Sequence, residues 1–432
     1  MARRAGGVVR PYGGDVVPLP AAGGRAVKPI RVGLRRACAA VAAAGVLLAP
    51  VAAGSAHGAP APAGAAPSPS AGTGFPVLTP AVAAELDAAV QRTLRETKVP
   101  GVIVGLWAPG KGSYVKAFGV ADKATSAPMT PGLKVRIGSE TKTFTVTALL
   151  RLVDRKKVGL DDPIGRYVPG VPNGDRITLR QLAGMRSGLF NYSEDPAFDK
   201  ALVTDPDRPF TPQELLGYSF RHPVQFAPDA RFEYSNTNLI LLGLVVEKIT
   251  GRPIGEVIAQ DVLKPAGLHR TLFPTGAEFP EPHAHGYTNQ TAGGKIEDST
   301  DWNPSWAWSA GAMISELQDL RSWAKTVATG TLLTPATQAE RLKTRSIGIP
   351  GAGYGLGIFD VQGWIGHNGS IPGYETLTVY LPQEKATMVL LMNTDVTVGG
   401  QEPSTLFGEA ITSVVTPGHV YPGHKPSVST GR

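Results

Sequence analysis

Cysteine is almost absent from this sequence. The only one among 432 residues is Cys38, which lies in an N-terminal stretch that we expect to be removed. The mature chain then has no disulfide, no thiol nucleophile and no cysteine-ligated metal site. A histidine site is also disfavoured, because His283 and His285 lie in a Pro- and Gly-containing loop with no His-Glu-x-x-His motif. We therefore expect neither a metal nor a cofactor.

Outside its first 58 residues the chain lacks net charge. The formal net charge is +7, but residues 1–58 hold eight lysine and arginine residues against one aspartate, and the remainder is balanced. This balance gives no reason to expect nucleic acid or an anionic membrane as a partner. With 42% hydrophobic residues the chain can bury a large core, and we expect a globular monomer.

Residues 1–58 are typical of a leader. Arg31, Arg35 and Arg36 precede an uncharged run of small and apolar residues, Cys38 to Gly54. This pattern predicts export with removal of the leader, and hence a secreted, extracellular protein. A retained membrane anchor and a twin-arginine export signal are the alternatives.

The folded domain is expected at residues 75–420. A linker precedes it at 59–74, where only Ala, Pro, Gly, Ser and Thr occur, a composition typical of disorder. Residues 421–432 form a short tail.

Two β-rich hairpins are expected near opposite ends of this domain. Val102–Trp107 and Tyr114–Val120 flank a Pro- and Gly-containing turn, and Tyr374–Leu381 and Thr387–Met392 flank residues 382–385. Helices are predicted to start at Thr79 and Pro80 and to cover Ser404 to Val415, and helical periodicity dominates roughly 143–345. The pattern predicts an α+β fold, an antiparallel sheet flanked by N- and C-terminal helices with a mainly helical second region.

The first candidate catalytic element is Ser139-Glu140-Thr141-Lys142, at the predicted start of a buried helix. Serine at i and lysine at i+3 share a helix face, so the Lys142 amine can reach the Ser139 hydroxyl. The positive N-terminal end of a helix also favours developing negative charge. Glu140 is expected to point away from Ser139 and is a poor candidate for a deacylating base.

Two other Ser-x-x-Lys matches are expected to be chance. Ser113 and Lys116 lie in a predicted strand, where residues i and i+3 point to opposite faces. Ser322 and Lys325 lie on the surface of an amphipathic helix.

The second element is Tyr234-Ser235-Asn236, just before an apolar helix at Leu239 to Ile249. In an extended loop these tyrosine and asparagine side chains can point into one cleft. Tyr234 can then relay a proton to a leaving group, and the Asn236 amide can hold a substrate carbonyl.

The third element is Gly366-His367-Asn368-Gly369-Ser370, which precedes the C-terminal hairpin and can form a strand edge along the cleft. His367 is expected to act there as a cation or proton donor that polarises Tyr234 and Lys142. Gly369 is expected to let substrate approach the backbone.

In order and spacing these elements resemble the signatures of the serine β-lactamase and penicillin-binding family, Ser-x-x-Lys, Tyr-x-Asn and Lys/His-x-Gly. The resemblance spans roughly residues 78 to 415. Further blocks are similar to its class C β-lactamase and D-alanyl-D-alanine carboxypeptidase branch, namely Leu182 to Leu189, Ser309 to Ser315 and Tyr354 to Gly357. The nearest likeness is to soluble, secreted D-alanyl-D-alanine carboxypeptidases, because of His367 and the segments Asp298 to Thr300 and Ser305 to Gly311.

The resemblance implies a role for each matching residue. Ser139 is the nucleophile, Lys142 its base, Tyr234 a proton shuttle and Asn236 a ligand of the substrate amide. The backbone N–H groups of Ser139 and Ser370 form the oxyanion hole. His367, Gly369 and Asn368 line the cleft, and Trp306 lines the pocket. The implied activity is that of a D-alanyl-D-alanine carboxypeptidase-like enzyme that reacts with β-lactams, and the implied partner is a peptidoglycan-type peptide or a β-lactam.

Two departures affect the expected substrate. Asn368 stands where threonine is common, and residues 358–362 contain no arginine to bind a substrate carboxylate. A β-lactamase and a small-ester esterase are therefore alternatives, as is a non-catalytic penicillin-binding sensor. A lipase-type α/β hydrolase is disfavoured, because no Gly-x-Ser-x-Gly motif occurs.

Overall fold

A computed structural model describes residues 74–421 of the chain. The expected leader at 1–58 lies outside these residues. So do the expected linker, apart from Gly74, and the expected tail, apart from Tyr421.

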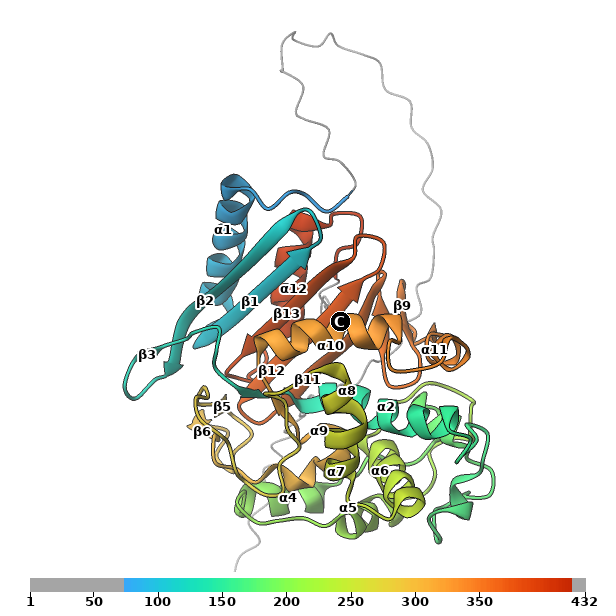
Figure 1. The fold of residues 1–432 in the computed structure, drawn as a ribbon. Helices are drawn as coiled ribbons and strands as arrows, with labels where there is room; N and C mark the ends of the chain where they lie inside the picture. Colours follow the sequence, from blue (N-terminus) through green and yellow to red (C-terminus); the bar gives the residue numbers. More distant parts are fainter. Residues whose placement is uncertain (1–73, 422–432) are drawn as a thin grey trace, which may run out of the picture. The chain divides into compact units, whose positions relative to one another are not determined.

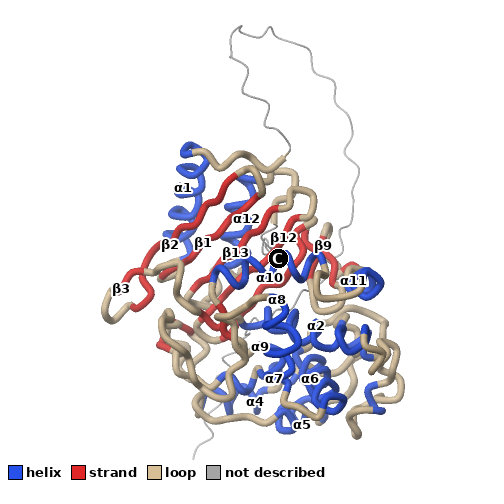
Figure 2. Tube along the Cα trace, viewed as in Figure 1, coloured by secondary structure: helices blue, strands red, loops and turns tan. Residues whose placement is uncertain are grey.

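A nine-stranded antiparallel sheet is built from both ends of the described chain (Figures 1 and 2). Its strand order is β3-β2-β1-β13-β12-β11-β10-β9-β8. The strands are β1 (Gly101–Ala108), β2 (Gly112–Asp122), β3 (Ala127–Pro128), β8 (Arg345–Ser346), β9 (Ala352–Tyr354), β10 (Phe359–Val361), β11 (Trp364–Ile371), β12 (Tyr374–Leu381) and β13 (Ala386–Met392).

The two predicted hairpins meet in the centre of the sheet. β1 pairs with β13, with Val102 opposite Met392 and Trp107 opposite Thr387. Every residue of β1, β12 and β13 is buried, because helices cover both faces of the sheet. The predicted fold class is confirmed.

Two terminal helices cover one face of this sheet. They are α1 (Pro80–Thr97) and α12 (Pro403–Val415), and Leu86 and Phe407 pack with Leu377 of β12 in one core. The predicted start of α1 is also found, since the Thr79 side chain caps the helix by accepting a hydrogen bond from the N–H of Val82.

The other face carries the mainly helical region. Phe144 of α2 stacks on Trp323 of α10 with ring centroids 4.1 Å apart, and Ala324 and Ala328 of α10 pack on Tyr380 of β12. The helices are α2 (Thr141–Asp154), α3 (Leu179–Ala183), α4 (Pro196–Thr204), α5 (Pro212–Phe220), α6 (Asn236–Thr250), α7 (Ile254–Ile258), α8 (Lys264–Ala266), α9 (Trp308–Gly311), α10 (Leu317–Thr329) and α11 (Pro335–Arg341).

Short strands tie this region together. β4 (Val135–Arg136) pairs with β7 (Ile314–Ser315), and β5 (Tyr287–Thr288) pairs with β6 (Glu297–Asp298). Within residues 74–421 no helix combines the length and apolarity that crossing a membrane requires.

Only the first half of strand β11 has a neighbouring strand on both sides. β10 pairs with Trp364, Ile365 and Gly366, whereas β12 pairs with β11 as far as Ile371. In the described chain, residues 367–371 therefore have a strand partner on one side only. The predicted strand edge is present, and the turn that carries Ser139 lies against it.

Candidate active site

Ser139 lies on a tight turn rather than inside the α-helix. Gly138–Glu140 form a 3₁₀ turn, η1, and α2 begins at Thr141. Gly138 has φ +50°, a left-handed conformation that glycine adopts without a Cβ clash. A Cβ on Gly138 would also lie only 2.7 Å from the backbone nitrogen of Ser370. The turn thus approaches β11 so closely that only glycine fits.

Lys142 reaches Ser139 from the first turn of α2. Its Nζ is 2.9 Å from Ser139 Oγ and 2.8 Å from the carbonyl oxygen of Ala310, to which it donates. The Lys142 side chain is fully buried, and this burial holds its pKa well below the usual range. A neutral amine donates to Ala310 and keeps a lone pair for the Ser139 hydroxyl. The pair is therefore arranged for proton transfer from serine to lysine.

Tyr234 closes the same site from the loop before α6. Lys142 Nζ lies 4.9 Å from the centroid of its ring. Burial raises the pKa of Tyr234 far above its usual value, the hydrogen bond with Ser139 lowers it, and the nearby Glu402 raises it. Tyr234 is consequently a neutral phenol that can donate a proton and regain it, and not a resident phenolate.

Of the two roles expected for His367, cation or proton donor, the structure disfavours the cation. His367 is 2% exposed, and burial, with a smaller effect of the positive charge that Lys142 carries when it is protonated, lowers the pKa of His367 to about 3. Its Nδ1 donates to the backbone oxygen of Asn368 over 2.5 Å, which leaves Nε2 to accept from the Tyr354 hydroxyl at 3.3 Å. The imidazole is therefore neutral. Its ring centroid lies 6.2 Å from that of Tyr234, so it borders the site as a packing and hydrogen-bonding group.

Asn368 projects from the opposite face of β11 to His367, because successive strand residues alternate. Its Nδ2 donates to Glu402, which precedes α12, over 2.8 Å. Asn368 is paired across the strands with Leu377, whose side chain belongs to the core under α12. The Asn368 side chain therefore points away from the cleft that His367 borders, contrary to our expectation.

Gly369 is required by contact within the protein. A Cβ at this position would lie 1.9 Å from the carbonyl oxygen of Ile137, the residue that leads into the Ser139 turn. From the sequence we expected Gly369 to let substrate approach the backbone, whereas in the structure it makes room for the Ile137 carbonyl. Ser370 follows at the exposed end of β11, with its backbone nitrogen beside Gly138. The Ser370 backbone thus lies against the turn that carries Ser139.

Asn236 is held by residues that the sequence analysis did not single out. Its backbone N–H donates to Asn191 Oδ1 over 3.0 Å, and its side-chain Nδ2 donates to Ser193 Oγ over 3.1 Å. Asn191 and Ser193 belong to the segment around the 3₁₀ turn η3 (Tyr192–Glu194). No local motif marks them, because the contact spans more than forty residues.

Trp306 is half-buried at the end of the 3₁₀ turn η5 (Pro304–Trp306). Its ring lies 5.9 Å from that of Phe198, and its carbonyl oxygen accepts from the Tyr192 hydroxyl at 2.6 Å. The ring thus packs among aromatic side chains of the helical region.

The chance Ser-x-x-Lys matches are separate from this site. Lys116 pairs with Asp87 of α1, with Nζ 2.8 Å from Oδ1. Ser322 donates to the carbonyl oxygen of Gln318 one turn earlier in α10. The hydrogen bonds of Lys116 and Ser322 are thus made to residues outside the candidate site.

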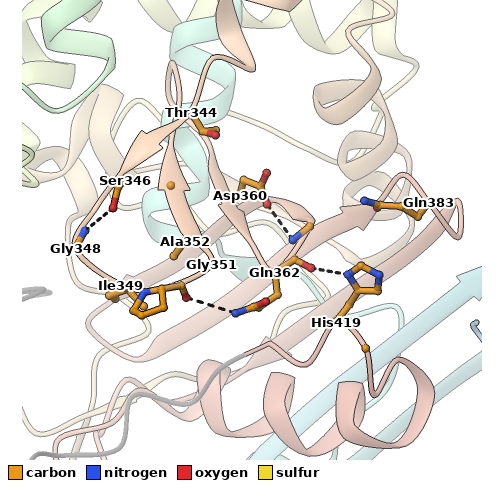
Figure 3. A pocket seen from close by; sticks show the side chains of 14 residues that line it. Thr344, Ser346, Gly348, Ile349, Gly351, Ala352, Asp360, Gln362, Gln383 and His419 are labelled. Carbon is orange, nitrogen blue, oxygen red and sulfur yellow. Dashed lines mark hydrogen bonds between the residues drawn. The ribbon is translucent and has the colours of Figure 1, made fainter. Parts of the chain in front are cut away.

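A separate pocket lies at the β8–β10 end of the sheet (Figure 3). Asp360, Gln362 and His419 line it, and His419 Nδ1 donates to the Gln362 backbone oxygen over 2.8 Å. None of the predicted catalytic residues borders it. Over residues 74–421 there is also no group of three or more His, Cys, Asp or Glu side chains placed to hold a metal ion.

Comparisons with known proteins agree with the fold and the motifs. The Beta-lactamase family profile matches residues 86–406. Protein flp of Staphylococcus aureus (strain MRSA252) is 26% identical over 72% of this chain and 62% of its own length. The putative penicillin-binding protein PbpX of Bacillus subtilis (strain 168) is 26% identical over 64% of this chain and 66% of its own length. The chain thus spans slightly less than two thirds of these relatives.

Among solved structures, two amide hydrolases cover most of the chain. A D-stereospecific amidohydrolase from a Streptomyces species is 32% identical with a TM-score of 0.66, covering 73% of this chain and 94% of its own. D-amino acid amidase from Ochrobactrum anthropi SV3, complexed with L-phenylalanine amide, is 30% identical with a TM-score of 0.67, covering 77% and 98%.

The contact between Ser139 and Lys142 predicts that they act as one unit. Replacing either with alanine should slow acylation by a fluorescent penicillin by about 10³-fold or more, and the double variant should lose little beyond the worse single change. The measurement is the rate of covalent labelling. Ser113→Ala and Ser322→Ala are controls and should label at nearly the wild-type rate. Normal labelling of Lys142→Ala, or losses that multiply, would exclude Lys142 as the base.

Proposed function

We propose that this chain, which belongs to the beta-lactamase family, is a serine hydrolase whose Ser139 is acylated by amides and peptides of D-amino acids. The observation that carries the proposal is the 2.9 Å contact between Ser139 Oγ and the buried amine of Lys142. Alkoxide formation at neutral pH needs a base within this distance.

Acylation begins when Ser139 Oγ attacks the substrate carbonyl carbon and its proton passes to Lys142. The carbonyl oxygen becomes an oxyanion, which the N–H groups of Ser139 and Ser370 stabilise. Collapse of this intermediate breaks the C–N bond, and the leaving nitrogen takes the hydroxyl proton of Tyr234. The Lys142 ammonium returns that proton to Tyr234, so both groups regain their neutral forms.

Deacylation uses the same groups in reverse. Water attacks the ester carbonyl, its proton passes through Tyr234 and Lys142, and Ser139 Oγ receives it as the ester bond breaks. Glu140 takes no part in activating this water, because its carboxyl lies towards β12 rather than towards Ser139.

Two observations favour a D-aminoacyl amide as the substrate. The two solved structures described above are a D-stereospecific amidohydrolase and a D-amino acid amidase, and the match covers almost the whole length of each. Residues 358–362 also contain no arginine, so this segment offers a substrate carboxylate no ion-pair partner. A neutral amide leaving group meets no such penalty.

The second candidate is the D-alanyl-D-alanine carboxypeptidase that the sequence blocks favour, acting on a peptidoglycan-type peptide and reacting with β-lactams. It uses the same D-aminoacyl intermediate and differs in its leaving group, a D-alanine with a free carboxylate. The alternatives to these two candidate functions are a β-lactamase, an esterase and a non-catalytic sensor, and the experiment below distinguishes them.

A substrate series separates these functions. We expect D-phenylalanine amide to be hydrolysed with kcat/KM at least about tenfold above that of the L-enantiomer, and an amidated D-Ala-D-Ala peptide to react as well as the free acid. Release of ammonia and D-alanine is measured, with Ser139→Ala as the control. Strong preference for the free acid would favour the carboxypeptidase. Fast β-lactam turnover without amide hydrolysis would favour a β-lactamase, and no Ser139-dependent reaction would favour the sensor.

We also propose that the mature enzyme is secreted, on the basis of the charge and apolar pattern of residues 1–58. N-terminal sequencing of the protein from the culture medium should find a start between Gly54 and Ala66. A membrane-bound protein that retains the leader would contradict this.

A further inference from the structure

Glu140, the residue after the candidate nucleophile, is a buried acid that the proposed reaction does not use. It is 1% exposed, and neither carboxyl oxygen has a hydrogen-bond partner of good geometry in the described chain. A buried carboxylate in this state would be very costly, whereas a neutral carboxylic acid costs much less.

Two threonine hydroxyls of β12 face this carboxyl. Thr376 and Thr378 lie two residues apart on one face of the strand, and both interact with Glu140. Thr376 already donates its hydroxyl proton to the carbonyl oxygen of Ile137 over 3.2 Å. Thr378 Oγ1 is buried and has no hydrogen-bond partner of good geometry of its own among residues 74–421.

This pattern of donors and acceptors suits a protonated acid. The Thr376 hydroxyl already donates its proton to Ile137, so towards Glu140 it can only accept a hydrogen bond. The Thr378 hydroxyl has no such partner and can donate to Glu140. A carboxylic acid donates through its O–H and accepts through its C=O, which satisfies both threonines. A carboxylate only accepts, and it would face the Thr376 lone pair with an uncompensated charge.

The same residues fix the turn that carries Ser139. Thr376 holds the carbonyl of Ile137, and Thr143 of α2 donates to the backbone oxygen of Glu140 over 2.7 Å. Ile137 is also anchored through its N–H to the carbonyl oxygen of Met313 over 2.9 Å. The Glu140 backbone is therefore held by α2, and its side chain is buried facing Thr376 and Thr378 of β12.

The titratable groups around Glu140 come from three elements. Lys142 lies two residues on in α2, and His367 of β11 borders Lys142. Tyr421, after α12, interacts with the charges of Glu140 and Glu402, and Glu402 in turn interacts with Glu375. None of these groups is a cation that pairs with the Glu140 carboxyl. Burial raises the pKa of Glu140 to about 8, and the Thr378 hydroxyl, which is free to donate to the carboxyl, lowers it.

We propose that Glu140 is a positioning residue that holds the Ser139 turn against β12 only while its carboxyl carries a proton, so that its ionisation inactivates the site in alkaline solution. An anionic Glu140 would repel the Thr376 lone pair and loosen the turn. It would also favour the protonated form of Lys142, which cannot act as a base. The inference rests on the proposed function only in taking Ser139 as the nucleophile.

Glu140→Gln tests the proposal, because glutamine keeps one donor and one acceptor but cannot ionise. The wild-type acylation rate should fall above about pH 8, and Glu140→Gln should keep its rate there while matching wild type within about threefold at pH 7. The readout is labelling by a fluorescent penicillin from pH 6 to 10. Glu85→Gln, an exposed change on α1, is the matched control and should retain the alkaline fall.

Thr378→Val provides an independent variant, since Thr378 lowers the pKa of Glu140. Its loss should move the alkaline fall to higher pH. An alkaline fall that is unchanged in both variants would overturn the proposal.

Thermal unfolding separates this proposal from the proposed function. The pKa of Glu140 is about 8 in the folded protein against an ordinary 4.5, so between these values the folded state binds more protons. Wild-type stability should therefore fall relative to Glu140→Gln as pH rises from 4.5 to about 8, and the Tm difference should then level off. A constant Tm difference would contradict a neutral Glu140, whether or not any substrate is turned over.

Discussion

The close contact between the Ser139 turn and strand β11 is the constraint on which the site depends. At Gly369 the carbonyl of Ile137 occupies the space that a Cβ would need. At Gly138 the backbone of Ser370 does the same. At this contact the helical region meets the open edge of the sheet. The Ser139 hydroxyl lies beside Lys142, and the Glu140 carboxyl lies towards β12. Both glycines allow two backbone segments to approach each other, so contacts within the protein explain why glycine is required at these positions.

Burial gives the site its chemical character. Lys142, Tyr234 and His367 all lie where water is largely excluded, and in each case burial favours the neutral form. The resting site then holds no full charge on these three groups, and Lys142 is free to accept the serine proton when the oxyanion forms. Glu140 fits the same pattern, because its raised pKa leaves it protonated near neutrality. The acid next to the nucleophile thereby avoids converting Lys142 into an ammonium.

Local patterns in the sequence were sufficient for the fold and for the pairing of Ser139 with Lys142. The hairpins follow from β-rich runs around Pro and Gly turns, and an i, i+3 spacing at a helix start brings two side chains together whatever surrounds them. His367 was expected as a cation and is neutral, because its burial arises from strands and loops distant in the chain. The partners of Asn368, Asn236 and His367 were missed for the same reason, since Glu402, Ser193 and Tyr354 meet them only through tertiary contacts. The block containing Tyr354 was noticed, but its sequence carries no sign that it would contact a histidine across the sheet.

The central claim is that Ser139 forms a covalent acyl-enzyme. Its most direct test is mass spectrometry of the protein after brief exposure to penicillin, followed by proteolysis to locate the adduct. The account predicts one added acyl group, on the peptide that contains Ser139, and none on the Ser139→Ala variant. An adduct on another residue, or equal labelling of the Ser139→Ala variant, would contradict it.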